Sequence, residues 1–583
     1  MQISDQTFLI MAAVAVGLVV GGGTLLFEKS LEYSSKFFWV TLPEWLGNHT
    51  VLLVLAPCLG ALLLVPFIVL FPRDATTDGV PATMEAVALH NGLMRWSNSF
   101  LRMVMSAITL GSGGSAGSEG PIIQIGSALA SGVGQSLRVS GNRLRVIVGC
   151  GAAAGLASIF NAPIAGVLFA LEVVLGEFNV HSFSPIVIAS VVATAFSRAF
   201  TTHGHSLWVL PYEMFNPWEI GLYALMGALT GCVSVVFIRI MEHMEHFFRY
   251  RVRLHKALKP AVGGLCVGII GLAYPQVYGY SYDPIIHAIS GDIPLALLVT
   301  LIGIKIVATG FTLGSGGSGG ILCPSLFLGA MTGSASGTVF KYLFPNLVSD
   351  PGGYGVVGMG AMLGAAIQAP MTAIIMIFEL TNVYSVILPM MIACITATLV
   401  QKSIVKGSIY TLSLARRGID IHAGREMGIL SALTVRDVME TKVTVIRSDT
   451  SYETILGACL KGKSNYLYVT DDEGNLEGVI SFSDLKEFIL EEGLGKLVLA
   501  KDVYNKEIVF VTPDESLASS LNKFSLIDIE QLPVVEQANG SLRIKGIISR
   551  SHLMNAYRQQ LLKHSLICDR PEGGACGPMS EVA

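Results

Sequence analysis

Four long stretches of the chain contain no Asp, Glu, Lys or Arg, and this absence of charge most restricts how the chain can fold. Each stretch is long enough to cross a lipid bilayer, or nearly so. The four are Phe8–Phe27, Val51–Phe71, Ile220–Ile238 and Thr381–Gln401. Only 14% of the 583 residues are charged, whereas a typical soluble chain has about 25%. The sequence therefore predicts an integral membrane protein.

Basic residues cluster directly after two of these stretches. One cluster lies between Arg249 and Lys259, and the other lies between Lys402 and Arg417. Cytoplasmic loops of membrane proteins carry an excess of Lys and Arg, so we expect both clusters in the cytoplasm. The first stretch lacks a basic n-region and a cleavage site, which indicates a retained helix. We expect a multi-pass protein of the cell (inner) membrane with a cytosolic C-terminal region.

The membrane-embedded part contains an internal repeat. GSGGSAGSEGP at 111–121 resembles GSGGSGGILCP at 314–324, and the two begin 203 residues apart. Further on, 149–172 resembles 358–379, and both segments end in glutamate. Two similar pairs in the same order are not explained by a chance abundance of glycine. Repeated halves with glycine-interrupted hydrophobic segments are typical of inverted-repeat transporters.

The glycines of the repeat indicate what the protein binds. Glycine and proline interrupt helices, so half-helices end inside the membrane, where irregular backbone is tolerated only around a cavity. Each half-helix N-terminus presents unpaired N–H groups and about half a positive charge. Several such ends directed at one place bind an anion, and neither glycine-rich segment contains a basic residue that would hold it tightly. The repeat predicts reversible binding of a small anion.

From about Leu433 the sequence changes to alternating strands and amphipathic helices, arranged in two units. The first unit runs from VRDVM at 435–439 to GVISFSDL at 478–485, and the second runs from KDVY at 501–504 to GIISRSHL at 546–553. Each unit is expected to contain a strand, a helix, a strand pair split by a turn, and a closing helix. This tandem resembles a pair of CBS domains.

Four segments of the membrane-embedded part resemble motifs of the CLC family of chloride channels and chloride/proton exchangers. GSEGP at 117–121 is similar to the family's GREGP, GGILCP at 319–324 to GGIFAP, and DGVP at 78–81 to SGIP. Tyr410, in GSIYTLSLARRG, takes the place of the tyrosine that closes the inner end of the pathway. The resemblance covers roughly residues 8–415 and is supported by NAPIAGVLFALE. It implies a homodimer with one anion pathway in each subunit.

The expected fold class is a polytopic α-helical membrane protein with inverted repeats and broken half-helices, followed by a cytosolic α/β CBS pair. The expected boundaries are a transmembrane region at 1–417, with repeat halves at about 50–200 and 216–415, a linker at 418–432, tandem CBS domains at 433–560 (433–490 and 498–560), and a disordered tail at 565–583.

The resemblance assigns the gating role to Glu119. A lone charged carboxylate at mid-membrane depth costs about 2.5–3.5 kcal/mol, so it is tolerated where it occupies a site made for anions and competes with the permeant ion. Protonation frees that site, which makes gating dependent on pH. The alternative is a carboxylate that only complements a helix dipole. The expected anion-binding residues are Asp78, Gly79, Ser118, Gly120, Ile321, Leu322 and Tyr410.

The sequence departs from the family at four positions. Asp78 aligns with the serine that donates its hydroxyl to chloride, Leu322 with a phenylalanine, and Ser118 with a basic residue. Val173 aligns with the internal proton-transfer glutamate of the exchangers. For Asp78 three explanations remain open: it is protonated and donates a hydrogen bond, it turns away from the pathway, or the alignment is off by one residue.

Val173 decides between the two main functional readings. It cannot carry a proton, and an apolar residue at this position is associated with channels in the family, so we predict passive anion flow. The alternative is a chloride/proton antiporter that uses another proton route. Glu172 is adjacent to Val173, but its more plausible role is structural.

The CBS pair offers one site for a regulator. The family pattern for contacting ribose is satisfied by Gly478, Ser481 and Asp484, whose carboxylate accepts from both ribose hydroxyls. In the second unit the same spacing from Gly546 gives His552 in place of the aspartate. We expect an adenine nucleotide (ATP, ADP or AMP) in the first cleft. The alternative is that the units serve only packing and dimer contact.

Other classes of function are less well supported. Asp78 and Glu119 in glycine-rich membrane loops would also suit a cation transporter with a nucleotide sensor. No nucleophile–base pair indicates an enzyme, the cysteines lack metal-ligand spacing, and no cofactor is required. The net charge of −4 indicates no particular partner, and no nucleic acid is expected.

Overall fold

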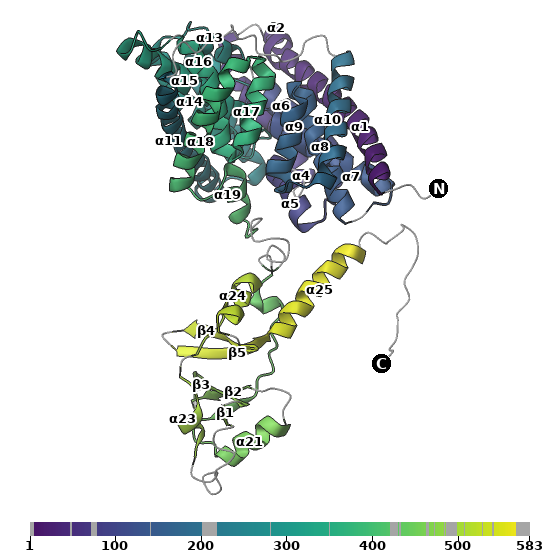
Figure 1. Cartoon of the computed structure of the whole chain (residues 1–583), viewed down its shortest axis with the longest axis vertical. Coiled ribbons are helices and arrows are strands. Elements are labelled where there is room, and N and C mark those ends of the chain that lie inside the picture. The colour runs from purple at the N-terminus through teal and green to yellow at the C-terminus, as the bar shows by residue number, and fades with distance from the viewer. Residues whose placement is uncertain are drawn as a thin grey trace. The chain divides into compact units, whose positions relative to one another are not determined.

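The computed structural model divides the chain into two compact units, Met1–Leu414 and Ala415–Ala583 (Figure 1). Each unit is described by itself. The residues that the structure describes are 5–46, 49–71, 79–139, 141–200, 218–279, 282–348, 350–419, 430, 433–461, 466–471, 473–482, 484–485, 498–506, 508–527, 529–538 and 541–566.

The described part of the first unit is built from helices. Its α-helices are α1 (Asp5–Lys36), α2 (Leu42–Leu46), α3 (His49–Leu63), α4 (Val65–Leu70), α5 (Gly79–Leu89), α6 (Ser97–Gly111), α7 (Glu119–Ser136), α8 (Asn142–Phe160), α9 (Pro163–Phe169), α10 (Val180–Phe200), α11 (Glu219–His246), α12 (Lys259–Ala273), α13 (Asp283–Ile289), α14 (Leu295–Gly314), α15 (Leu322–Leu343), α16 (Pro351–Ile367), α17 (Pro370–Thr381), α18 (Ile387–Ile404) and α19 (Ile409–Ala415). Short 3-10 or π segments join some of them: η1 (Phe37–Thr41), η2 (Ala170–Leu175), η3 (Phe247–Arg251), η4 (Lys256–Leu258), η5 (Pro275–Val277) and η6 (Tyr384–Val386).

Seven helical segments within the described ranges are long and apolar enough to cross a membrane. They are Thr7–Trp45, Asn142–Phe160, Val180–Phe200, Glu219–Arg251, Lys256–Ala273, Leu295–Gly314 and Tyr384–Ala415. The helices that follow the two glycine-rich segments, α7 and α15, have 18 and 22 residues. Helix α5 is shorter, with 11 residues, and most of its residues are buried within the protein.

The helices of the two halves pack in the same pattern. Helix α1 packs against α6, α8 and α10, and α11 packs in the same way against α14, α16 and α18. Figure 1 shows the first half, in purple and blue, on one side of the unit and the second half, in green, on the other. Equivalent helices meet across the middle in the pairs α3–α12, α7–α15 and α9–α17. The structure is therefore consistent with the repeat read from the sequence.

Backbone conformation repeats as closely as packing does. Gly113 and Gly316, which are 203 residues apart, have φ angles of 102° and 104°. Asn161 and Gln368 end α8 and α16 in the left-handed conformation, each with a φ of 56°. Residues other than glycine rarely adopt this backbone conformation. Its recurrence at matching positions therefore indicates that the two halves have the same backbone structure there.

The second unit contains two small sheets and their helices. Its elements are η7 (Val435–Asp437), β1 (Val445–Arg447), α21 (Tyr452–Lys461), β2 (Tyr466–Thr470), β3 (Leu476–Ser481), α23 (Ala500–Val503), α24 (Leu517–Ile527), β4 (Gln531–Ala538), β5 (Ser541–Ser549) and α25 (Arg550–Leu566). Strands β1 and β2 are parallel, and β2 pairs antiparallel with β3 in the order β1-β2-β3. Strands β4 and β5 pair antiparallel. The predicted strand pairs are therefore present in both halves.

The halves of this second unit exchange segments. Val435, from the first segment of the tandem, is fully buried in the core formed by α24, β4, β5 and α25. In return Ala500, from the start of the second half, is buried in the core formed by α21, β2 and β3. Backbone hydrogen bonds fix the exchange, with Val435 N–H donating to Glu515 O at 2.9 Å and Ala500 N–H to Thr450 O at 2.9 Å. Neither half has a complete core without the other.

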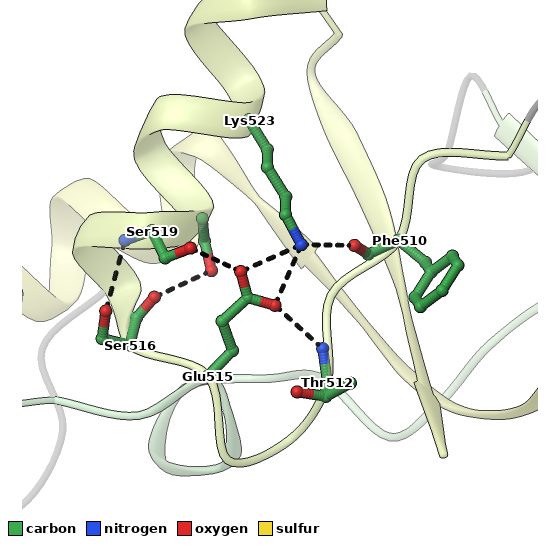
Figure 2. A network of polar contacts seen from close by, with 7 residues as sticks. Phe510, Thr512, Glu515, Ser516, Ser519 and Lys523 are labelled. Carbon is green, nitrogen blue, oxygen red and sulfur yellow. Dashed lines mark hydrogen bonds and ion pairs between the residues drawn. The ribbon is translucent and has the colours of Figure 1, made fainter. Parts of the chain in front are cut away.

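A polar network ties the start of α24 to the strand region beside it (Figure 2). The Glu515 carboxylate accepts from Ser519 Oγ at 2.6 Å, Thr512 N–H at 3.2 Å and Lys523 Nζ at 3.0 Å. Lys523 Nζ also donates to Phe510 O at 2.9 Å. Burial by itself would raise the pKa of Glu515, but the hydrogen bonds from Ser519, Lys523 and Thr512 outweigh it and lower the pKa below its usual value.

Candidate functional site

The two glycine-rich segments meet at the centre of the first unit. Gly117 N–H donates to Gly320 O at 2.8 Å, and Gly320 N–H donates to Gly117 O at 2.7 Å. These reciprocal bonds form an isolated antiparallel bridge between the loop that precedes α7 and the loop that precedes α15. The N-termini of two half-helices, one from each repeat, are thereby held side by side.

Hydroxyl groups from the helices before these loops hold the loops in place. Ser115 N–H donates to Thr312 Oγ1 at 3.0 Å, and Ser318 N–H donates to Thr109 Oγ1 at 3.3 Å. Each member of the first pair lies 203 residues from its counterpart in the second pair, so each half binds the loop of the other. Ser318 Oγ also lies 2.7 Å from Ser106 Oγ. All these groups are buried, so the polar loops are paired inside an apolar unit.

Glycine is required where the half-helices touch. A Cβ on Gly117 would collide with Oε2 of Glu119, and a Cβ on Gly120 would lie 2.8 Å from the Cα of Gly320. The start of α5 joins the same junction, because a Cβ on Gly79 would lie 2.6 Å from the carbonyl oxygen of Gly120. Real Cβ atoms do not approach so closely. Three half-helix N-termini therefore converge, and their N–H groups and dipoles favour a negative charge.

Glu119 is the first residue of α7 and is 1% exposed. Its Oε2 accepts from Cys323 N–H, on the first turn of α15, at 3.4 Å. The Tyr282 hydroxyl, immediately before α13, also interacts with this carboxylate. Its Oε1 is buried and has no hydrogen-bond partner among the residues that the structure describes. The carboxylate thus occupies a place where backbone N–H groups converge, with part of its bonding capacity unused.

The structure describes all but one of the other expected anion-binding residues. Ser118, Gly120, Ile321 and Leu322 form the buried first turns of α7 and α15 at the junction. Gly79 joins them through α5. Asp78 lies outside the described residues, so its role stays a prediction.

Tyr410 approaches the junction from α19. It is 4% exposed, and its hydroxyl oxygen is buried without a hydrogen-bond partner in the described part of the chain. It lies close enough to Glu119 for the charges of the two groups to interact. A buried unpaired hydroxyl is a donor available to an anion.

Glu172 and Glu379 connect the halves in a second place. Glu172 Oε2 accepts from Thr372 N–H at 2.8 Å and from Thr372 Oγ1 at 2.6 Å, at the start of α17. Glu379 accepts from Ile164 N–H at 3.0 Å and Ala165 N–H at 2.7 Å, at the start of α9. Each carboxylate therefore caps the half-helix of the other repeat. This agrees with the structural role preferred for Glu172 and leaves the neighbouring Val173, in the π segment η2 and 7% exposed, as an apolar position.

In the second unit the predicted ribose-contacting residues lie together. Asp484 Oδ2 accepts from Ser481 N–H and from Ser481 Oγ, both at 2.8 Å. These bonds fix the aspartate at the exposed end of β3, beside the helical turn that contains it. His552 takes the equivalent place after β5. Its N–H donates to Ser549 Oγ at 3.2 Å, as the Asp484 N–H donates to Ser481 Oγ at 3.3 Å, but His552 has no carboxylate. His552 Nε2 lies 3.8 Å from Glu440 Oε2.

The sequence interpretation missed two groups that contact Glu119 and a buried lysine on α14. The Cys323 backbone N–H and the Tyr282 hydroxyl contact the carboxylate directly. Lys305 is 3% exposed, and its Nζ donates to Val277 O at 3.0 Å. One signal was present for Lys305, because it is the only charged residue in the 20 residues of α14.

Comparisons with known proteins support this description. A family model described as "Voltage gated chloride channel" matches residues 59–402, and a model described as "CBS domain" matches 435–491 and 500–559. The chain is 31% identical to the "H(+)/Cl(-) exchange transporter ClcA" of Salmonella arizonae, over 70% of this chain and 88% of that protein.

Two solved structures have the same fold. One is a "slow cyanobacterial Cl-/H+ antiporter", with a TM-score of 0.65, 24% identity, and coverage of 71% of this chain and 99% of that chain. The other is a "eukaryotic CLC transporter", with a TM-score of 0.63, 18% identity, and coverage of 93% and 97%. The predicted fold class, a polytopic helical membrane unit followed by an α/β CBS pair, is confirmed.

Proposed function

The chain belongs to the voltage gated chloride channel (CLC) family of membrane anion transporters, and from this premise we propose that it exchanges chloride for protons. The relative named an H(+)/Cl(-) exchange transporter and the fold neighbour named a Cl-/H+ antiporter favour this antiport reading over the passive channel that Val173 led us to predict. The observation that carries the proposal is the place of Glu119, whose carboxylate lies where half-helices of both repeats meet.

The geometry suggests how one carboxylate serves both ions. Ionised Glu119 accepts from Cys323 N–H and occupies the positive end of α15, so it competes with a permeant anion. Protonation removes the negative charge and weakens that hydrogen bond. The carboxyl group then leaves, an anion takes its place, and Tyr410 supplies a further donor. Alternate occupation of one site by a carboxylate and an anion links proton uptake to anion movement.

The proton must reach Glu119 without a titratable group at Val173. Glu172 does not supply the route in this proposal, because its carboxylate is bound by Thr372 and Met371 of the other half. A route without a second protein carboxylate is therefore part of the proposal.

Passive chloride flow is the second candidate, and Val173 is the observation that favours it. Both candidates make Glu119 the gate, but they differ in whether protons move against their gradient. A cation transporter is a weaker candidate, because the convergence of helix N-termini favours an anion.

The test is proton movement in proteoliposomes that contain the full-length protein. With an inward chloride gradient and an initial pH equal on both sides, exchange predicts outward proton pumping that stops when chloride is replaced by an impermeant anion. Chloride flux without proton movement would contradict antiport and support the channel. In a potassium chloride gradient, a reversal potential near that of potassium would contradict both.

We further propose that the protein is a homodimer in the inner membrane and that its CBS pair lies in the cytosol. The pair is proposed to bind an adenine nucleotide at Asp484. The orientation of the Asp484 carboxylate by Ser481 supports the nucleotide site. Calorimetry with ATP, ADP and AMP on the purified full-length protein is the direct test. Absence of heat with all three would leave packing and dimer contact as the role of the pair.

A further inference from the structure

Tyr282 is a half-buried tyrosine whose hydroxyl group reaches the gate carboxylate. It is the residue immediately before α13. Its hydroxyl group forms a hydrogen bond with the carboxylate of Glu119. An ionised carboxylate can only accept hydrogen bonds, so the tyrosine is the donor. A side chain from outside both glycine-rich loops therefore helps to hold the carboxylate.

The backbone of Tyr282 is fixed by α13. Its carbonyl oxygen accepts from Ile285 N–H at 2.9 Å and from Ile286 N–H at 3.0 Å. Ile285 is fully buried, and α13 packs against α15 and α16. The N–H of Cys323, at the start of α15, donates to Glu119. The hydroxyl donor and the backbone donor of the gate therefore come from two helices that pack against each other.

The chain just before Tyr282 contacts the loop that carries the gate. Gly279 N–H donates to Gly113 O at 3.4 Å. A Cβ on Gly113 would lie 3.2 Å from Cδ1 of Tyr278. Gly113 belongs to the loop between α6 and α7, and Glu119 follows this loop as the first residue of α7. Contacts on both sides of Tyr282 in the sequence therefore fix its place beside the gate.

The other groups that interact with the carboxylate carry no fixed charge. Of the described titratable residues, the Cys323 thiol and the Tyr410 hydroxyl interact with Glu119 in addition to Tyr282. None of the charged or titratable residues of α5, α6, α13 and α14 does so within the described part of the chain. Those residues are Glu85, Arg102, Asp283, His287 and Lys305. Neutral donors therefore determine how well the ionised carboxylate is held.

We propose that Tyr282 is a positioning residue for the gate: its hydroxyl group holds the ionised Glu119 carboxylate in the anion site and sets the pH at which the gate opens. This inference rests on the proposed function, in which protonation of Glu119 frees the site. A hydroxyl group donates more strongly to a carboxylate than to a neutral carboxyl group. The hydrogen bond from Tyr282 therefore favours the ionised, closed form of the gate.

The test is the pH dependence of chloride flux in proteoliposomes that contain the full-length protein. Tyr282→Phe removes only the hydroxyl group of a half-buried side chain. Without this donor the ionised carboxylate is less stable, so Glu119 is protonated at higher pH. We expect the midpoint of the pH response to move upward by about one pH unit.

Tyr278→Phe is the matched control. Tyr278 precedes Tyr282 by four residues, but its hydroxyl group donates to Gly268 O at 3.0 Å. Its removal should leave the midpoint of the pH response at the wild-type value. An equal shift in the two variants would overturn the inference, because a loosened segment and not a lost donor would then be the cause.

The Glu119→Gln background shows whether Tyr282 acts through the gate. Glutamine does not titrate, so Tyr282→Phe should cause no shift in that background. A shift that persisted there would overturn the inference, because another group, such as Asp78, would then be responsible for it.

Two further outcomes separate the inference from the proposed function. An unchanged midpoint in Tyr282→Phe, with the response of the wild type abolished in Glu119→Gln, would overturn the inference and leave the proposed gate standing. A wild-type pH response that remained in Glu119→Gln would contradict the proposed gate, and the inference would fail with it.

Discussion

The two units of the chain are both built from two similar halves, but they join their halves in different ways. In the membrane unit, buried polar groups connect the halves: the bridge between Gly117 and Gly320, and the caps that Glu172 and Glu379 place on each other's half-helices. In the CBS unit, the halves exchange short segments and bury apolar residues such as Val435 and Ala500 in each other's cores.

The difference follows from the surroundings of each unit. In lipid, neither unpaired N–H groups nor broken helices are tolerated unless protein satisfies them, so the membrane halves meet through hydrogen bonds. In water, burial of apolar surface is the main favourable term, so the CBS halves meet through their cores. The bridge and the caps, which recur in both halves, are structural. Two functional candidates lie where the symmetry fails: Glu119 matches Leu322, and Asp484 matches His552.

The largest expected effect comes from breaking a symmetric cap. Glu172→Ala leaves the buried N–H of Thr372 without its acceptor, and Glu379→Ala does the same to Ala165. Each lost partner costs about 1–3 kcal/mol, so both variants should melt at clearly lower temperature in detergent, by similar amounts. Thermal unfolding of the purified protein, followed by size-exclusion chromatography, measures this.

Glu177→Ala is the control for the caps, because that carboxylate is 54% exposed and makes only a 3.8 Å ion pair with Arg145. It should melt like the wild type. A melting temperature unchanged by Glu172→Ala but lowered by Glu379→Ala would show that the two caps are not equivalent, and the comparison of the halves would have to be revised.

The next effect separates the two CBS halves. Asp484→Ala removes an acceptor for two ribose hydroxyls and should weaken nucleotide binding by about 1–3 kcal/mol, roughly tenfold to a hundredfold. His552→Ala should change the affinity little, because that position already lacks the carboxylate. Calorimetry on full-length protein compares them. Equal losses of nucleotide affinity in the two variants would mean that the difference between Asp484 and His552 does not locate the nucleotide site.

A smaller effect concerns pH and the second CBS half. The lowered pKa of Glu515 means that its stabilising contacts are present above its unfolded value of about 4.5 and are lost as the pH falls through the lower folded value. Glu515→Gln should cost about 1 kcal/mol at neutral pH, since the pair with Lys523 is only partly shielded from solvent. The cost should vanish well below pH 4.5.

Hydrogen exchange of the Thr512 amide in full-length protein measures this difference, with the wild type and Glu515→Gln compared at each pH so that intrinsic exchange rates cancel. The first half provides a reference, because Thr450 stands where Glu515 stands in the second half, 65 residues earlier. A variant difference that persisted unchanged below pH 4 would show that the ionised carboxylate is not what stabilises this region.

The sequence predicted the elements that depend on local patterns. Uncharged stretches predicted the helices, the two pairs of similar segments predicted the equivalence of the halves, and the glycines around Glu119 predicted a loop. Contacts between residues about 200 positions apart could not be predicted from the sequence, because they depend on how the two halves pack. The hydrogen bonds from Cys323 to Glu119 and from Thr372 to Glu172 are of this kind.

Other features lacked a clear sequence signal for a different reason. The exchange of the segment around Val435 cannot be read from a repeat, since the same two units could fold with each segment in its own half. Lys305 was visible as a lone charge, but its contacts with Val277 O and the Phe327 ring depend on the rotation of α14, which its nearly uniform apolar sequence does not specify.

The central claim is that Glu119, at the junction of the repeats, is the group whose protonation opens the anion pathway. The most direct measurement is chloride flux into proteoliposomes across a series of pH values, for the wild type and for Glu119→Gln at equal protein density. Glutamine resembles the protonated carboxyl group and cannot titrate. We predict that wild-type flux rises as the pH falls, and that Glu119→Gln flux is at least as fast as the wild type and independent of pH. A Glu119→Gln variant with the pH response and rate of the wild type would contradict the account.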